Sequence, residues 1–428
     1  MASFLFTFSA FAAPPPIDLQ ASVDRALQTH PGIQSLRLSY EALLERPAQE
    51  RALPDPMLGY TFMYEDVVTA NGPIRGVLEL SQEIPFQGKR KLRAGVSALE
   101  AAAAAKLWLA AQLEVEHQVR VAFYDLFRVD RSLAVVQEEA DVLDRLESVA
   151  RSRYANGLAG QGDALRAQTE RSRLEERLLL LAEEREATAA RFNRAVGLTA
   201  ASPVGAALTL PRPPAEMPSD AELYRLARAL RPEVAEARQL AEAGRLAEDL
   251  AKREFYPDFR VGLQWNRIGS TSNPFSPDPG QDAYMLMVGV TLPVWRGKLQ
   301  SGVREAQAST AAAEAAARDR EIGAEAEVRA ALAALRTRRD LVQLYNGTLV
   351  PQADSTLRAA EAAYRNDAGD FLAVLDSERS LLGMRLAHAV VLGEMGAAVA
   401  DLERSVGASA EDWPTALAAP SAPEGEGR

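Results

Sequence analysis

The chain has 428 residues, no cysteine and a formal net charge of −11. The absence of cysteine excludes disulfides and thiolate metal sites, and the negative charge argues against a nucleic-acid partner. His30, His117 and His388 are far apart in the sequence, and each is interpreted as an ordinary helix residue. The composition therefore predicts no cofactor and no metal site.

Residues 1–12 have the pattern of a signal peptide, because an apolar run ends in the small-residue site Ala10-Phe11-Ala12. The pattern lacks a Lys or Arg before the apolar run. No later stretch has about 18 uninterrupted apolar residues, so no transmembrane helix is expected. We expect an exported chain.

Four segments alternate apolar and polar residues, as half-buried strands do. They lie near 57–66, 74–85, 258–268 and 283–293, and the link at 65–73 is expected to be a loop. Each segment is about as long as a tilted strand that crosses a bilayer. Aromatic residues at the strand ends fit an interfacial girdle: Phe86, Phe255, Tyr256 and Trp295. The alternative is an ordinary soluble hairpin with one buried face.

If the strands cross a membrane, the polar face would line a lumen. Its candidate residues are Arg75, Glu79, Arg260 and Gln264. Methionines fall on the same face, at Met57, Met63, Met285 and Met287. Thioethers are soft metal ligands, although methionine also serves simply to fill irregular space.

Long helices are predicted over 88–155, 163–196, 298–365 and 370–406, which are rich in Ala, Leu, Glu and Arg. Pro351 lies inside the third of these, where a kink is expected. Helices of this length need neighbours along their whole length. The segment 408–428 is expected to be a disordered tail.

The sequence repeats at a fixed offset of 210 residues. Tyr154 matches Tyr364, Leu165 matches Leu375, and Val196-Gly197 matches Val406-Gly407. We therefore predict two repeats, 13–210 and 211–407. Four strands cannot close a membrane barrel, and an open sheet edge is not tolerated in hydrocarbon, so copies of the chain are expected to pool their strands.

The strand–strand–long-helix order, the repeat and two turn motifs resemble the TolC family of outer-membrane factors. The motifs are "RYANGLAGQGDALRAQ" from residue 153 and "LVPQADSTLRAAEAAYRNDAGDFLAVLDSERSLL" from residue 349. "LSQEIPFQGKRK" and "LVPQA" are most similar to the heavy-metal-efflux branch. The resemblance implies a mainly α fold with a membrane β part, in which a twelve-stranded trimeric β-barrel continues into a long α-helical barrel.

The resemblance also implies a function: a passive trimeric channel in the outer-membrane lipid, with its helical tunnel in the periplasm and no enzyme activity. A periplasmic adaptor and an inner-membrane pump would be its partners, and heavy-metal cations are candidate substrates. Type I secretion and drug efflux remain open, as does a non-transporting periplasmic coiled-coil scaffold.

Two groups of functional residues are expected from the family's helix tips. The adaptor-docking tips would be Asn156 and Gly157 in the first turn and Asn366 and Asp367 in the second. The periplasmic gate would involve Asp376, Asp163 and Arg166, with an Arg166–Asp376 pair holding the closed state. The alternative is that these three are solvated charges on helix surfaces.

Overall fold

The computed structural model describes residues 15–157, 160–210, 212–214, 217–272, 274–276, 278–366 and 368–418. The predicted signal peptide and Asp367 lie outside these ranges. The chain divides into two compact units. Unit 1 consists of Met1–Ser35, Leu109–Pro232 and Glu321–Arg428, and unit 2 of Leu36–Trp108 and Glu233–Arg320. Each unit thus takes residues from both predicted repeats.

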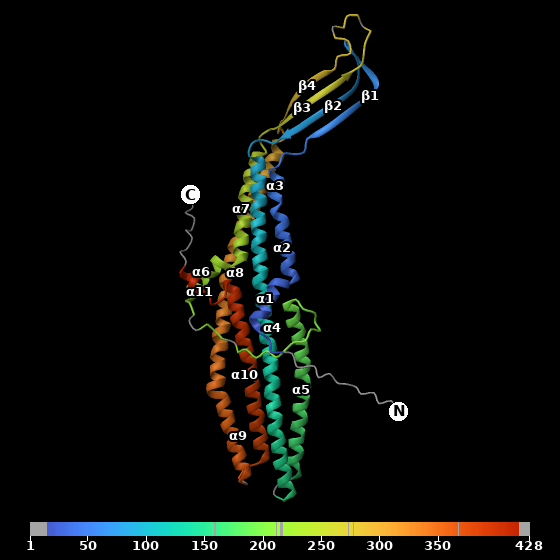
Figure 1. The fold of residues 1–428 in the computed structure, drawn as a ribbon. Coiled ribbons are helices and arrows are strands. Elements are labelled where there is room, and N and C mark those ends of the chain that lie inside the picture. The colour runs from blue at the N-terminus through green and yellow to red at the C-terminus, as the bar shows by residue number, and fades with distance from the viewer. Residues whose placement is uncertain are drawn as a thin grey trace, which may run out of the picture. The chain divides into compact units, whose positions relative to one another are not determined.

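Unit 2 contains a four-stranded antiparallel sheet in the order β1-β2-β3-β4 (Figure 1). Its strands are β1 (Met57–Thr69), β2 (Gly72–Ile84), β3 (Asp258–Ile268) and β4 (Ala283–Thr291). They lie in the four segments whose alternation predicted strands. The loop expected at 65–73 is wrong, because Val67, Val68 and Thr69 continue β1. The β-branched residues favour strand, and Gly72 follows the short turn with φ of 133°.

Helical segments accompany the sheet in unit 2. They are α3 (Arg46–Arg51), most of α2 (Pro31–Leu44) and of α7 (Pro232–Arg253), and the first parts of α4 (Lys89–Ala155) and α8 (Arg296–Leu344). Gly244 of α7 faces Thr310 of α8, where an added Cβ would come within 3.1 Å of the Thr310 hydroxyl. The missing side chain lets the two backbones approach closely.

Unit 1 contains the remainder of α4, two hairpins of long helices, and α1 (Leu19–Thr29) and α6 (Asp220–Leu230). One hairpin pairs α4 with α5 (Gln161–Val196), and the other pairs α9 (Val350–Arg365) with α10 (Phe371–Val406) (Figure 1). Their apolar stripes share one buried core: Val135, Val136, Leu143, Ala150, Ala167, Leu174, Leu181, Leu357, Tyr364, Phe371, Val374, Leu375, Leu381 and Leu386.

The helices α5 and α10 are matched in detail. Each has 36 residues. Each ends in valine followed by a left-handed glycine, Gly197 with φ of 81° and Gly407 with φ of 89°. A glycine in this conformation is a common helix stop because it has no Cβ to clash. The two helices therefore share a length and a stop signal as well as the 210-residue offset.

The predicted helix 298–365 is not one regular helix. A π-helical turn, η1 (Tyr345–Leu349), separates α8 from α9. Pro351 lies just after it and lacks the N–H that a regular helix uses at that position. The π turn is the local irregularity that interrupts the regular helix between α8 and α9.

The expectation of a disordered tail over 408–428 is wrong for its first part. Residues Trp413–Ala418 form α11. The indole of Trp413 is only 1% exposed, and its Nε1 donates a hydrogen bond to the Ala408 carbonyl at 3.1 Å. One large buried aromatic side chain is enough to fix this short segment.

Among the described residues, α4 and α10 are each long and apolar enough over part of their length to cross a membrane. The prediction of no transmembrane helix depends on uninterrupted apolar runs, and a few charged residues interrupt the apolar parts of these two helices. Core helices of soluble proteins pass the same criterion. Because α4 and α10 both supply residues to the buried core of unit 1, we interpret them as core helices and not as membrane spans.

Candidate channel surfaces and helix tips

The sheet register separates an apolar face from a polar face. Directly opposed residues of antiparallel strands point to the same side. Leu58, Leu80, Leu263 and Leu286 form one cross-strand row, and Tyr60, Leu78, Trp265 and Tyr284 form the next row on that side. The other side carries the row Gly59, Glu79, Gln264 and Met285.

The apolar face is not covered by any other part of the described chain. Leu58 and Leu286 are each 68% exposed, and Tyr284 is 79% exposed. A contiguous exposed apolar surface marks a protein or membrane contact. The soluble hairpin with a buried apolar face therefore does not describe this sheet, whose apolar face is free for a lipid or protein contact.

Three of the four predicted lumen residues lie together on the polar face. Glu79 is opposite Gln264, and Glu83 is opposite Arg260. The Arg260 guanidinium lies 4.0 Å from the Glu83 carboxylate. Arg75 lies where the register of β2 shifts, between Ile74 and Gly76, so strand alternation alone does not assign its face.

At the corner between β2 and α4, a buried lysine joins two distant segments of unit 2. Lys89 is 1% exposed. Its Nζ lies 2.9 Å from Asp258 Oδ1 and 3.0 Å from Glu254 Oε2, and donates to the Tyr256 carbonyl at 3.0 Å. The Phe86 amide donates to Asp258 at 2.7 Å. A buried charge is tolerated only when it is paired and hydrogen-bonded in this way.

In the sequence, Lys89 begins the basic run Lys89-Arg90-Lys91, a pattern that does not indicate a buried side chain. An aromatic stack closes the same corner, with the rings of Phe86 and Tyr256 4.6 Å apart. Gly88 has φ of 95° and lies beside the Arg253 guanidinium. The strand-to-helix corner is thus held by one charge network, one ring stack and one left-handed glycine.

The predicted tip residues lie at the ends of the long helices of unit 1. Asn156 and Gly157 follow α4, and the amide of Gly157, with φ of 74°, donates to the Tyr154 carbonyl at 3.0 Å. Asn366 ends α9, and its amide donates to the Ala362 carbonyl at 3.2 Å. All three are exposed, which is the arrangement that a docking surface needs.

Each of the three predicted gate residues lies near the start of α5 or α10. Arg166 lies 3.9 Å from Asp163 on its own helix. Asp376 accepts a hydrogen bond from Arg379, also on its own helix, at 3.0 Å. Within the described chain, Arg166 therefore pairs with Asp163 along α5 and Asp376 pairs with Arg379 along α10, instead of Arg166 with Asp376.

Sequence analysis missed the ion pair that does link α5 to α10. Arg379 donates to both carboxylate oxygens of Glu170, to one of them at 3.0 Å. Arg173 adds a contact of 2.8 Å. The hydrogen bond from Arg379 is the main reason that the pKa of Glu170 lies below its usual range. A spacing of 209 residues hides this pair from local sequence patterns.

A second missed feature is a pair of buried carboxyl groups, Glu139 on α4 and Glu378 on α10, each 1% exposed. Burial and the neighbouring Glu139 raise the pKa of Glu378 to about 9. The Nη1 atom of Arg385 lies 3.7 Å from the Glu139 carboxylate. Glu378 is therefore a neutral acid at pH 7.

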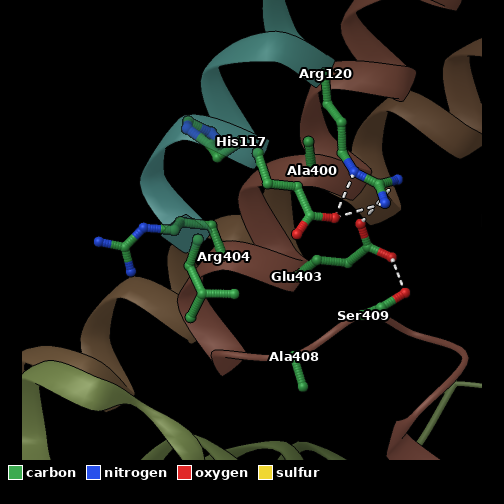
Figure 2. Close-up of a pocket in the computed structure, with 9 residues that line it drawn as sticks. His117, Arg120, Ala400, Glu403, Arg404, Ala408 and Ser409 are labelled. Atoms are coloured by element: carbon green, nitrogen blue, oxygen red, sulfur yellow. Dashed lines mark hydrogen bonds and ion pairs between the residues drawn. The ribbon is translucent and has the colours of Figure 1, made fainter. Parts of the chain in front are cut away.

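A third charged cluster anchors the segment after α10 (Figure 2). The Arg120 guanidinium lies 2.7 Å from Glu116 and 3.6 Å from Glu403, and Glu403 accepts the Ala410 amide at 2.9 Å. Burial raises the pKa of Glu403, while the Ala410 amide and Arg120 oppose it. The enclosed space is about 20 Å³, room for one water molecule, so we interpret it as structural.

Comparison with known proteins agrees with this geometry. The profile of the family "Outer membrane efflux protein" matches residues 223–408. The cobalt-zinc-cadmium resistance protein CzcC of Cupriavidus metallidurans is 24% identical over 404 residues, covering 92% of this chain and 90% of CzcC.

Solved structures share the fold. The outer membrane protein VceC of Vibrio cholerae has a TM-score of 0.75 at 22% identity, covering 91% of this chain and 96% of VceC. A membrane protein of Pseudomonas aeruginosa has a TM-score of 0.78 at 20% identity, covering 92% and 91%. CusC has a TM-score of 0.78 at 15% identity, covering 94% and 96%.

The four-stranded sheet and the long helical hairpins thus belong to a fold that is shared with VceC and CusC. The chain is therefore similar to outer membrane efflux proteins over residues 223–408 and shares the fold of the solved relatives over more than nine-tenths of its length. These comparisons agree with the predicted location in the bacterial outer membrane, with the helical tunnel in the periplasm.

Proposed function

We propose that three copies of this chain assemble into a passive conduit of a tripartite efflux system. The observation that carries the proposal is the four-stranded sheet, which has two unpaired edges, β1 and β4, and an exposed apolar face. Hydrocarbon does not tolerate unpaired backbone groups, so each β4 would pair with β1 of the next copy. Three such sheets give a closed barrel of about twelve strands, within the range of bacterial outer-membrane barrels.

The helical hairpins would assemble in the same way into a tunnel. The matched helices α5 and α10, together with the 210-residue offset, support two repeats, 13–210 and 211–407. Each repeat would supply one hairpin and one strand pair. Three copies then place about six equivalent hairpins around an axis, where long helices bury their apolar stripes against neighbours.

The tips around Asn156-Gly157 and Asn366 would dock a periplasmic adaptor, which in turn contacts an inner-membrane pump. Heavy-metal cations are the proposed cargo, supported by the name of the relative CzcC. Drug efflux and type I secretion would use the same architecture, so transport assays must separate them.

Light scattering in detergent tests the assembly. We expect a mass of three chains, and a monodisperse monomer would exclude the barrel. Complementation then tests transport: the gene, supplied with its adaptor and pump to cells that lack them, should raise tolerance to cobalt, zinc or cadmium. Unchanged metal tolerance with restored drug tolerance would reassign the cargo.

Short insertions after Gly157 and after Asn366 test the docking tips. We expect the trimer to form and efflux to be lost, because the insertions change an exposed turn and leave the core intact. Insertions at Ala70, in the turn between β1 and β2, serve as the control. Normal efflux from both tip variants would place docking elsewhere.

The gate is tested by single-channel conductance. Three-fold symmetry would bring three Asp376 carboxylates around the axis, where like charges repel unless cations neutralise them. Asp376→Asn should weaken block by divalent cations. Conductance and block equal to those of the parent would remove Asp376 from the gate.

A further inference from the structure

Methionines are concentrated at the two edges of the polar sheet face. Met57 lies on edge strand β1, and Met285 and Met287 lie on edge strand β4. The register places Met57, Ser81, Gly262 and Met287 in one row and Gly59, Glu79, Gln264 and Met285 in the next. The three methionines therefore share one face, opposite the apolar face.

These thioethers are accessible. Met57 is 60% exposed, Met285 is 44% exposed and Met287 is 38% exposed. The row leaves space for them, because Gly262 has no side chain and the Met287 methyl carbon lies 3.5 Å from the position that a Cβ on Gly262 would take. Met287 thus lies over the face of the sheet, above a glycine.

Two sulfurs on one strand suit a single ion. Met285 and Met287 are two residues apart and on the same side, so their Cα atoms are about 7 Å apart. Each side chain has three rotatable bonds and adapts to irregular surroundings. Both thioethers can therefore turn toward one ion between them. Met63 is not included, since it lies where the register of β1 shifts.

Barrel closure would add a third sulfur. The edge strands β1 and β4 are the ones that would pair between neighbouring copies, so Met57 of one copy would approach the methionines on β4 of the next. This step rests on the proposed trimeric barrel. The pair Met285 and Met287 stands within one chain and does not depend on it.

The ligand chemistry selects the ion. Neutral, polarisable thioethers prefer soft monovalent cations such as Cu(I) and Ag(I), whereas Zn(II) takes thiolate, imidazole and carboxylate ligands. The described residues contain no group of three or more His, Cys, Asp and Glu that could hold a metal ion. The full sequence has no cysteine, so no thiolate competes for a soft ion.

We propose that Met285 and Met287, joined by Met57 of the neighbouring copy, form a binding site for soft monovalent metal cations on the lumen face of the barrel. Cu(I) or Ag(I) would bind at this site transiently while passing through the barrel. It adds soft monovalent cations to the heavy metals that are proposed as cargo.

Silver binding to the purified protein in detergent tests the site, in nitrate buffer because chloride precipitates silver. We expect saturable binding of Ag(I) by calorimetry and no competing uptake of Zn(II). The double variant Met285→Leu/Met287→Leu should lose this binding, and Met57→Leu should weaken it only in the trimer. Met-to-Leu changes conserve volume and are expected to keep the fold.

The matched control is Met217→Leu/Met384→Leu, which removes two methionines from unit 1 and should bind silver like the parent. Methyl NMR of methionine provides a second readout, in which the resonances absent from the double variant should be those that silver shifts. A parent that binds no silver, or a double variant that binds it fully, overturns the site. Light scattering on the same samples reports separately on the trimer, so failure of the proposed function is distinguished from failure of the site.

Discussion

Two buried charged sites in this protein are built in opposite ways. At the strand-to-helix corner of unit 2, the Lys89 ammonium has two carboxylates and a carbonyl within 3.1 Å. In unit 1, Glu378 is buried beside another acid, Glu139, and the cation Arg385 lies 3.7 Å from Glu139. At the corner, opposite charges neutralise Lys89, whereas between α4 and α10 Glu378 is neutral because it keeps its proton.

The difference has a physical consequence. Burial and the neighbouring Glu139 raise the pKa of Glu378 to about 9, so its proton is lost as pH rises toward that value. The packing of α4 against α10 is therefore a part of the protein that pH can weaken.

The largest expected effect comes from breaking the corner. Lys89→Met should lower the free energy of unfolding by about 2–3 kcal/mol, because it removes a buried ammonium that pairs with two partly exposed carboxylates, of which Glu254 keeps Arg93 at 3.2 Å. Urea unfolding of the detergent-solubilised protein measures it. Lys91→Met, at an exposed position two residues away, should change it by less than about 0.5 kcal/mol. Equal effects of the two variants would show that the corner does not depend on its buried lysine.

Glu378→Gln should stabilise the protein at neutral and alkaline pH. The pKa of Glu378 is raised from 4.5 to about 9 in the folded protein. A raised pKa contributes stability fully below pH 4.5, and that stability is lost as pH rises toward 9. The glutamine variant cannot lose a proton, so its melting temperature should match the parent at about pH 4.5 and exceed it increasingly up to pH 9.

Glu176→Gln on the exposed face of α5 is the matched control and should show no such pH trend. A constant difference between Glu378→Gln and the parent at all pH values would mean that Glu378 does not hold the proton.

Breaking the link between α5 and α10 should cost less. Arg379→Ala removes both hydrogen bonds to Glu170, although Arg173 remains 2.8 Å from that carboxylate. We expect a loss of about 1.5 kcal/mol, the lower end for hydrogen bonds to charged groups. The loss should shrink as pH falls toward the lowered pKa of Glu170. A pH-independent loss would assign the effect to packing of the arginine stem.

Arg166→Ala should have the smallest effect, below about 0.5 kcal/mol, because its contact with Asp163 is 3.9 Å long and Arg166 is 51% exposed. Thermal melting of the trimer measures it. A loss as large as that of Arg379→Ala would indicate that Arg166 has a partner in a neighbouring copy.

The sequence predicts this fold well where a local pattern carries it. Alternation located all four strands, and the alanine-rich composition located α4, α5 and α10. Two local features escaped, because a single large side chain decides α11 through Trp413 and a backbone irregularity precedes Pro351. Pro351 predicted a break in the helix, but it did not predict that the break is a π turn.

The charged sites were harder to predict because their members come from distant segments. Lys89 stands in a run of basic residues that is typical of an exposed surface, and only the fold brings Glu254 and Asp258 to it. The link from Glu170 to Arg379 spans 209 residues. Local spacing placed Asp163, Arg166 and Asp376 on their helices but could not say which charges would meet.

The equal lengths of α5 and α10 limit how this protein can change in evolution. Both have 36 residues between a turn and a left-handed glycine. One inserted residue would rotate the rest of its helix by about 100° and turn the buried stripe away from the core. Seven inserted residues return the stripe to within about 20°. Longer or shorter relatives should therefore differ by steps such as about 7, 11 or 18 residues, which keep the stripe within about 20°, with the same change made in both repeats and in both arms of each hairpin.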